Sequence, residues 1–164
     1  MAENQGYPET ENAEDREIVL NRSFNAPREL VWEAWSRPEH LANWWGPKGF
    51  AIASQQFDFK PGGVWKFTMH GPDGVAFPNQ IVFVEMQKPE RLVYATSDGE
   101  EEGPGQFQTT VTFREDDGGT SITMRLLFKT AAERDHAVRE YGAVEGGKQT
   151  LDRLAELLAL LTGN

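Results

Sequence analysis

The ionisable residues that could act as acids, bases or metal ligands are scattered through this 164-residue sequence. His40, His70 and His136 lie far apart, and a metal site needs three or four converging ligands, so we expect no metal. There is no cysteine to act as a nucleophile or a thiolate ligand. No serine has the setting of a hydrolase nucleophile elbow. No glycine-rich phosphate loop is present, so no cofactor is expected.

Acid–base chemistry would need residues that are distant in the sequence to meet in one cavity. The carboxylate candidates are Asp58 and Glu85, and their partners would be His70, Tyr94 or Tyr141. Such a pair must lie within hydrogen-bond reach to transfer a proton. A cyclase- or hydrolase-type enzyme is therefore an alternative to a binding protein, and the residues alone identify no catalytic group.

Large apolar side chains at alternating positions are the stronger chemical signal. In GGVWKFTMH (62–70), Trp65, Phe67 and Met69 share one face of a predicted strand, because successive side chains alternate between faces. Later strands repeat this alternation with Tyr94, Phe107, Met124, Leu126 and Phe128. Such side chains suit the wall of an apolar pocket and equally suit an ordinary core. The pattern does not separate the two.

Two adjacent tryptophans stand in HLANWWGPKGF (40–50), just before a Gly-Pro loop signal. Neighbouring side chains on a helix point about 100° apart, so the two indoles must diverge. Leu41 lies three residues before Trp44 and shares its face. We therefore expect Trp44 to close the core and Trp45 to hang over the mouth of a cavity.

The net charge of −10 is concentrated in three segments. Residues 1–17, 98–102 and 115–117 together carry −12, so the rest of the chain carries +2. No basic patch appears, and nucleic acid is not an expected partner. No apolar run approaches the roughly 20 residues that cross a bilayer, and the N-terminus lacks a signal-peptide pattern. We expect a cytoplasmic protein with no membrane partner.

Residues 1–15 are expected to be a disordered acidic tail, because they contain little to bury, and 16–164 to be one domain. The alternation of 16–24 predicts a strand, and Pro27 opens a short helix. Ser36 and Glu39 form a candidate capping box for a second short helix. Six further strands are predicted at 51–59, 63–70, 77–87, 91–97, 105–114 and 119–129.

The C-terminal segment predicts a short helix over 129–142 and then a long one. Val144, Leu151, Leu154, Leu158 and Leu161 keep helical spacing in the long helix. Seven strands about 4.8 Å apart make a sheet roughly 29 Å wide, which one helix roughly 10 Å across cannot cover. The sheet must therefore curl around the helix, and such an arrangement favours an internal cavity.

Two glycines of the long helix bear on the same question. Gly146 and Gly147 have no side chains to fill the space near the sheet, and each costs about 1 kcal/mol of helix propensity relative to alanine. They indicate either room for a cavity or a frayed first turn.

Four linked segments resemble one protein superfamily. They are FNAPRELVWEAWSRPEHLANWWGPKGF, PGGVWKFTMHGPDG, FVEMQKPERLVY and QTLDRLAELLA. Together they are similar to the START-like, SRPBCC superfamily, and most similar to the branch named for the C-terminal domain of heat-shock protein 90 ATPase activators. The resemblance implies an α+β helix-grip (START-like, Bet v-like) fold: a curved antiparallel sheet around a long C-terminal helix, with two short helices after the first strand.

The superfamily includes lipid carriers, polyketide cyclases and co-chaperone domains, so the fold does not settle the function. We expect a protein that binds a small hydrophobic molecule, aromatic or lipid-like, rather than an enzyme. A chaperone partner that the protein regulates and a homodimer are the other interactions considered. The expected ligand-binding residues are Trp45, Trp65, Phe67, Met69, Tyr94, Phe107, Met124, Phe128, Tyr141 and Gly147.

Overall fold

The structure is a computed structural model that describes residues 13–97 and 107–163. Most of the acidic tail and the acidic turn expected at 98–105 lie outside the described residues. Residues 13–15 were expected to be disordered, and this prediction is wrong, because Ala13–Arg16 forms a 3-10 helix, η1. The Arg16 side chain is buried and donates from Nη1 to the Phe128 carbonyl oxygen at 3.1 Å, which ties this turn to the sheet.

The chain forms seven strands and four α-helices within the described residues. The strands are β1 (Glu17–Phe24), β2 (Ala51–Phe57), β3 (Val64–His70), β4 (Ala76–Gln87), β5 (Arg91–Ser97), β6 (Phe107–Asp116) and β7 (Gly119–Phe128). The helices are α1 (Arg28–Ser36), α2 (Pro38–Trp44), α3 (Ala131–Tyr141) and α4 (Ala143–Thr162). Strand boundaries agree with the sequence prediction to within two residues.

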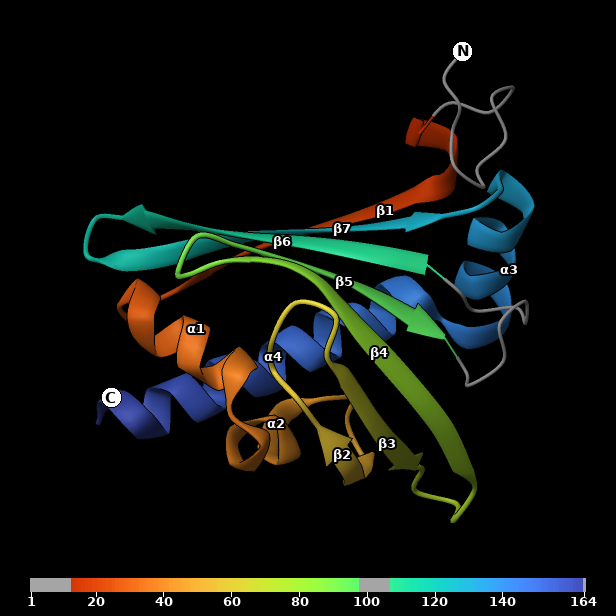
Figure 1. Ribbon diagram of the computed structural model, residues 1–164, viewed down its shortest axis with the longest axis horizontal. Helices are drawn as coiled ribbons and strands as arrows, with labels where there is room; N and C mark the ends of the chain where they lie inside the picture. The colour runs from red at the N-terminus through yellow and green to blue at the C-terminus, as the bar shows by residue number, and fades with distance from the viewer. Residues whose placement is uncertain (1–12, 98–106, 164) are drawn as a thin grey trace.

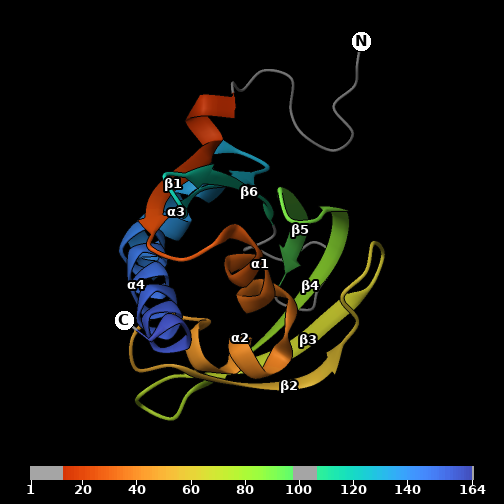
Figure 2. The same ribbon diagram turned by 90° about the vertical axis from the view of Figure 1, so that its left-hand side faces the viewer.

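The strands form one antiparallel sheet in the order β1-β7-β6-β5-β4-β3-β2. Strands β2 to β7 follow one another as hairpins, whereas β1 pairs with β7 at the far edge. Figure 1 shows α4 running across the concave side, and Figure 2 shows the sheet curled with α4 along its open side. The predicted α+β helix-grip fold is confirmed.

Two irregularities interrupt the ladder where the sheet bends. The register shifts between Ser54 and Gln56 on β2 and between Phe83 and Glu85 on β4. Such bulges bend a strand and increase its local twist. They help the sheet to curl around the helices.

The two short helices meet at Arg37, and the predicted capping box is wrong. Arg37 is the N-cap of α2, and no side chain caps this helix. Pro38 occupies the first helical turn and keeps Arg37 extended. The Ser36 hydroxyl instead donates to the Glu33 carbonyl oxygen at the end of α1.

One end of the curled sheet is filled by side chains from α1. The Trp32 and Trp35 rings pack edge-on against Phe113, with ring centroids 5.4 and 5.3 Å apart. From α4, the predicted core residues Leu151, Leu154 and Leu158 are buried. Leu161 was also expected in this stripe, but it is 41% exposed because it lies in the last turn of the helix, and Leu157 is buried instead.

None of the helices in the described part of the chain has the length and hydropathy of a membrane-spanning segment.

Candidate functional site

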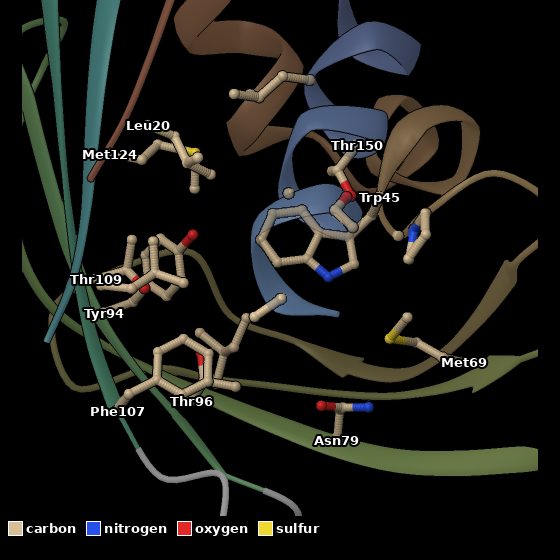
Figure 3. Close-up of a pocket in the computed structure, with 18 of the residues that line it drawn as sticks. Leu20, Trp45, Met69, Asn79, Tyr94, Thr96, Phe107, Thr109, Met124 and Thr150 are labelled. Carbon is tan, nitrogen blue, oxygen red and sulfur yellow. The ribbon is translucent and has the colours of Figure 1, made fainter. Parts of the chain in front are cut away.

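A cavity of about 300 Å³ lies between the sheet and the N-terminal half of α4. The helix side is formed by Gly142, Ala143, Gly146, Gly147, Thr150 and Leu151. The sheet side is formed by Leu20, Phe67, Met69, Asn79, Ile81, Tyr94, Thr96, Phe107, Thr109, Met124 and Leu126. The end of α2 and the following loop add Trp44, Trp45, Gly46 and Pro47. Figure 3 shows these walls facing one another.

The two glycines of α4 bring the helix close to the sheet and the loop. A Cβ atom on Gly147 would lie 2.5 Å from Leu20 Cδ1, and one on Gly146 would lie 3.5 Å from Pro47 Cγ. The first turn of the helix is intact, because Gly146 donates to the Gly142 carbonyl oxygen at 2.8 Å. The glycines therefore belong to the cavity wall and not to a frayed turn.

The two adjacent tryptophans diverge as the sequence predicts. Trp44 is 1% exposed, and its ring centroid lies 4.7 Å from that of Trp35. Its Nε1 donates to the Ala34 carbonyl oxygen at 3.0 Å. Trp45 is partly buried and turns toward the sheet, with its ring centroid 5.0 Å from Trp65 and 6.2 Å from Tyr94. Trp44 therefore closes the core.

Trp45 is part of the cavity lining. In Figure 3 its indole projects between a wall that includes Tyr94 and Thr109 and a wall that includes Met69 and Asn79. The indole therefore lines the cavity, and its place at the mouth stays a prediction. A ligand in this cavity would lie against the Trp45 ring.

Arg153 holds the loop that carries Trp45, and sequence reasoning missed it. From the middle of α4, its Nη1 atom lies 3.0 to 3.3 Å from the carbonyl oxygens of Trp45, Gly46, Pro47 and Phe50. Its Nη2 atom donates to the Asn43 carbonyl oxygen at 3.3 Å. Burial lowers the pKa of the Arg153 guanidinium from its ordinary value. In sequence, an arginine within an amphipathic helix looks like any solvated charge.

The cavity is lined by no Asp, Glu, Lys, Arg or His side chain among the described residues. Its polar side chains are Asn79, Tyr94, Thr96, Thr109 and Thr150. The Thr150 hydroxyl is already used, because it donates to the Gly146 carbonyl oxygen at 2.9 Å. The site can therefore bind an apolar ligand and form a few hydrogen bonds to it through neutral side chains.

Tyr94 is the ionisable residue of this lining, and it is only 3% exposed. Burial raises the pKa of its phenol well above the ordinary value, despite the opposing effects of the nearby Trp35 indole and Thr109 hydroxyl. Tyr94 lies directly opposite Thr109 in the β5–β6 ladder. The two hydroxyl-bearing side chains therefore share one patch of the wall.

The structure places the ten expected ligand-binding residues in three settings. Seven line the cavity: Trp45, Phe67, Met69, Tyr94, Phe107, Met124 and Gly147. Trp65 and Phe128 are buried behind the lining. Trp65 stacks on Phe67, and Phe128 packs against Phe107. The side chain of Tyr141 lies outside the described part of the structure.

The acid–base pairs considered from the sequence are not assembled in the cavity. Glu85 accepts a hydrogen bond from Arg91 Nε at 3.2 Å, and Asp58 accepts one from Gln56 at 3.3 Å. Neither carboxylate lines the cavity, and His70 is exposed. Glu85 pairs with Val93, the neighbour of Tyr94, so the alternation of β4 turns it to the other face, and Asp58 lies past the end of β2. In the described residues, no three His, Asp or Glu side chains are grouped for a metal ion.

Comparison with known proteins gives the chain a family. Residues 25–159 match the model of the family described as Activator of Hsp90 ATPase homolog 1-like protein. Comparison with curated proteins gave no match.

Solved structures agree in fold. A protein from Nitrosomonas europaea is 27% identical with a TM-score of 0.81, covering 92% of this chain and 98% of its own. A protein from Chromobacterium violaceum is 26% identical with a TM-score of 0.77, and the match covers 87% of this chain and 96% of the other. A protein from Arthrobacter aurescens is 24% identical with a TM-score of 0.82, and the match covers 91% of this chain and 89% of the other. This last similarity supports the fold alone.

This fold supports a ligand-binding or regulatory role in general. The family match spans most of the chain, and the curved sheet around α4 is the expected architecture. The protein belongs to the Activator of Hsp90 ATPase homolog 1-like family of the START-like superfamily.

Proposed function

We propose that the protein binds a small, uncharged, hydrophobic molecule in the cavity between the sheet and α4. The observation that carries this proposal is a cavity of about 300 Å³ whose lining, within the described residues, contains no charged side chain. That volume is at the lower end of the roughly 300–1,000 Å³ typical of ligand pockets.

The lining favours uncharged ligands over charged ones. Transfer of an isolated charge from water into an apolar site is strongly unfavourable without a partner of opposite charge, and no such partner lines this cavity among the described residues. The apolar side chains of Phe67, Met69, Phe107 and Met124 would instead bury hydrocarbon surface, at about 25 cal/mol for each Å² removed from water.

Titration with N-phenyl-1-naphthylamine, an uncharged fluorescent probe, tests this proposal. The blocking variant is Thr96→Phe, because Thr96 lines the cavity from β5. The matched control is Thr112→Phe, which makes the same change on neighbouring β6 at a partly exposed position outside the lining.

We expect the probe to bind the unmodified protein and the Thr112→Phe variant with dissociation constants within twofold of each other. Thr96→Phe should weaken binding at least tenfold, about 1.4 kcal/mol, because its ring occupies the ligand's space. Equal binding to both variants would place the probe elsewhere and refute the proposal, as would no binding to any of the three proteins.

A further inference from the structure

Tyr94 adds one of the few polar groups to the mostly apolar wall of the cavity. Its side chain is buried, and the nearby Thr109 hydroxyl and Trp35 indole oppose the rise in its pKa. The Trp35 Nε1 atom itself has no hydrogen-bond partner among the described residues, so it does not hold the Tyr94 oxygen.

The Tyr94 hydroxyl is placed to donate into the cavity. A phenol has one hydrogen to donate. Figure 3 shows the Tyr94 hydroxyl pointing into the cavity, on the side of the Trp45 indole. Thr109, opposite Tyr94 in the ladder and 1% exposed, provides a second hydroxyl on the same patch.

The phenol is in its donating form at neutral pH. A tyrosine is ordinarily protonated there, and burial raises the pKa of Tyr94 further. An acceptor that enters this patch therefore meets a neutral donor that is in place before the ligand arrives.

The surrounding rings favour an aromatic ligand. Trp45, Phe67, Tyr94 and Phe107 present ring surfaces to the same cavity. Aromatic pairs gain about 0.5–1.5 kcal/mol beyond the area they bury when they meet edge-on or offset. A carbonyl oxygen has two lone pairs and could accept from both Tyr94 and Thr109.

We infer that the ligand is an uncharged aromatic molecule with a carbonyl oxygen, and that Tyr94 donates the hydrogen bond which selects it. This inference rests on the proposed function, because it requires ligands to enter the cavity. It adds the chemical class of the ligand and the residue that recognises it.

Two probes of nearly the same shape test the hydrogen bond. Benzophenone carries a carbonyl group, and diphenylmethane has a methylene group in its place. Displacement of N-phenyl-1-naphthylamine gives a dissociation constant for each, with the unmodified protein and with Tyr94→Phe. Thr110→Val, at a position outside the cavity lining on β6, controls for the loss of a hydroxyl elsewhere on the sheet.

We expect the unmodified protein to prefer benzophenone. Tyr94→Phe should reduce this preference about 3- to 10-fold, as one neutral hydrogen bond would, and should leave diphenylmethane binding within twofold. Thr110→Val should leave the preference unchanged. An unchanged preference in Tyr94→Phe, with both probes still bound, refutes the hydrogen bond but not the proposed function. No displacement by either molecule, while N-phenyl-1-naphthylamine still binds, refutes this inference and leaves the proposed function standing.

A second measurement detects the hydrogen bond at the carbonyl group itself. The infrared carbonyl stretch of bound benzophenone should lie at lower frequency than in cyclohexane, because a hydrogen bond weakens the C=O bond. In the Tyr94→Phe variant it should return toward the cyclohexane position. A carbonyl band for benzophenone bound to the unmodified protein at the cyclohexane position would overturn the inference.

Discussion

Trp44 and Trp45 are neighbours in the sequence with different environments, and their alanine variants should differ accordingly. Truncation of a buried tryptophan typically costs about 3–5 kcal/mol, and Trp44→Ala would also remove the hydrogen bond to Ala34. Trp45 is partly exposed to the cavity, so Trp45→Ala should cost less stability and weaken probe binding more. Urea unfolding and probe titration measure the two effects. Equal stability losses with unchanged binding would assign both indoles to the core.

Arg153 binds backbone rather than a carboxylate, and its removal should loosen the loop beneath the cavity. Hydrogen bonds that involve a charged group contribute about 1.5–3 kcal/mol. We therefore expect Arg153→Met, which keeps the aliphatic stem, to lower the free energy of unfolding by about 1–3 kcal/mol and to shift Trp45 fluorescence. Lys148→Met, which removes an exposed cation from the same helix, should leave both unchanged. Wild-type stability and fluorescence in Arg153→Met would show that the loop holds without it.

The two adjacent glycines of helix α4, Gly146 and Gly147, should respond differently to substitution by alanine. Gly146→Ala places a Cβ at ordinary contact distance from Pro47, so it should stabilise the protein by up to about 1 kcal/mol through helix propensity. Gly147→Ala places a Cβ 2.5 Å from Leu20 Cδ1, so Leu20 must move and the gain should be reduced or reversed. Thermal unfolding compares the two variants. Equal stabilisation would mean that Leu20 moves without cost.

Strand β1 and helix α4 are joined by an ion pair that should make stability depend on pH. Arg22 Nη1 lies 2.6 Å from Asp152 Oδ1, and this hydrogen bond lowers the pKa of Asp152 below its ordinary value of 3.8. A carboxyl with a lowered folded-state pKa stabilises the fold above its unfolded pKa, and the effect is lost as pH falls through the folded value.

Asp152→Asn should therefore be less stable than the unmodified protein at pH 6, and the difference should shrink as pH falls below 3.8. Urea unfolding at several pH values measures this convergence. Glu140→Gln removes an exposed carboxylate on α3 and serves as the control. A difference between Asp152→Asn and the unmodified protein that stays constant across this pH range would show that the ion pair does not contribute.

For the molecule as a whole, the sequence predicted the architecture better than the division between core and cavity. Period-two alternation placed Trp65 and Phe67 on one strand face, and both point inward. Of these two residues, only Phe67 lines the cavity. The curl of the sheet around α4 decides which inward-pointing residues border the cavity, and the alternation does not encode that curl. The Tyr94–Trp45 ring contact and the Arg153 contacts join residues 49 and more than 100 positions apart, and no local pattern signals them.

The methionines provide the most direct test of the cavity as a ligand site. Met69 and Met124 line it, whereas Met86 packs against the core outside the lining and serves as an internal control. Methyl NMR spectra of protein labelled at methionine should be recorded during titration with N-phenyl-1-naphthylamine. We predict saturable shifts of the Met69 and Met124 methyl signals and little change at Met86. Signals of Met69 and Met124 that stay in place while the probe binds, or that shift no more than Met86, would contradict the account.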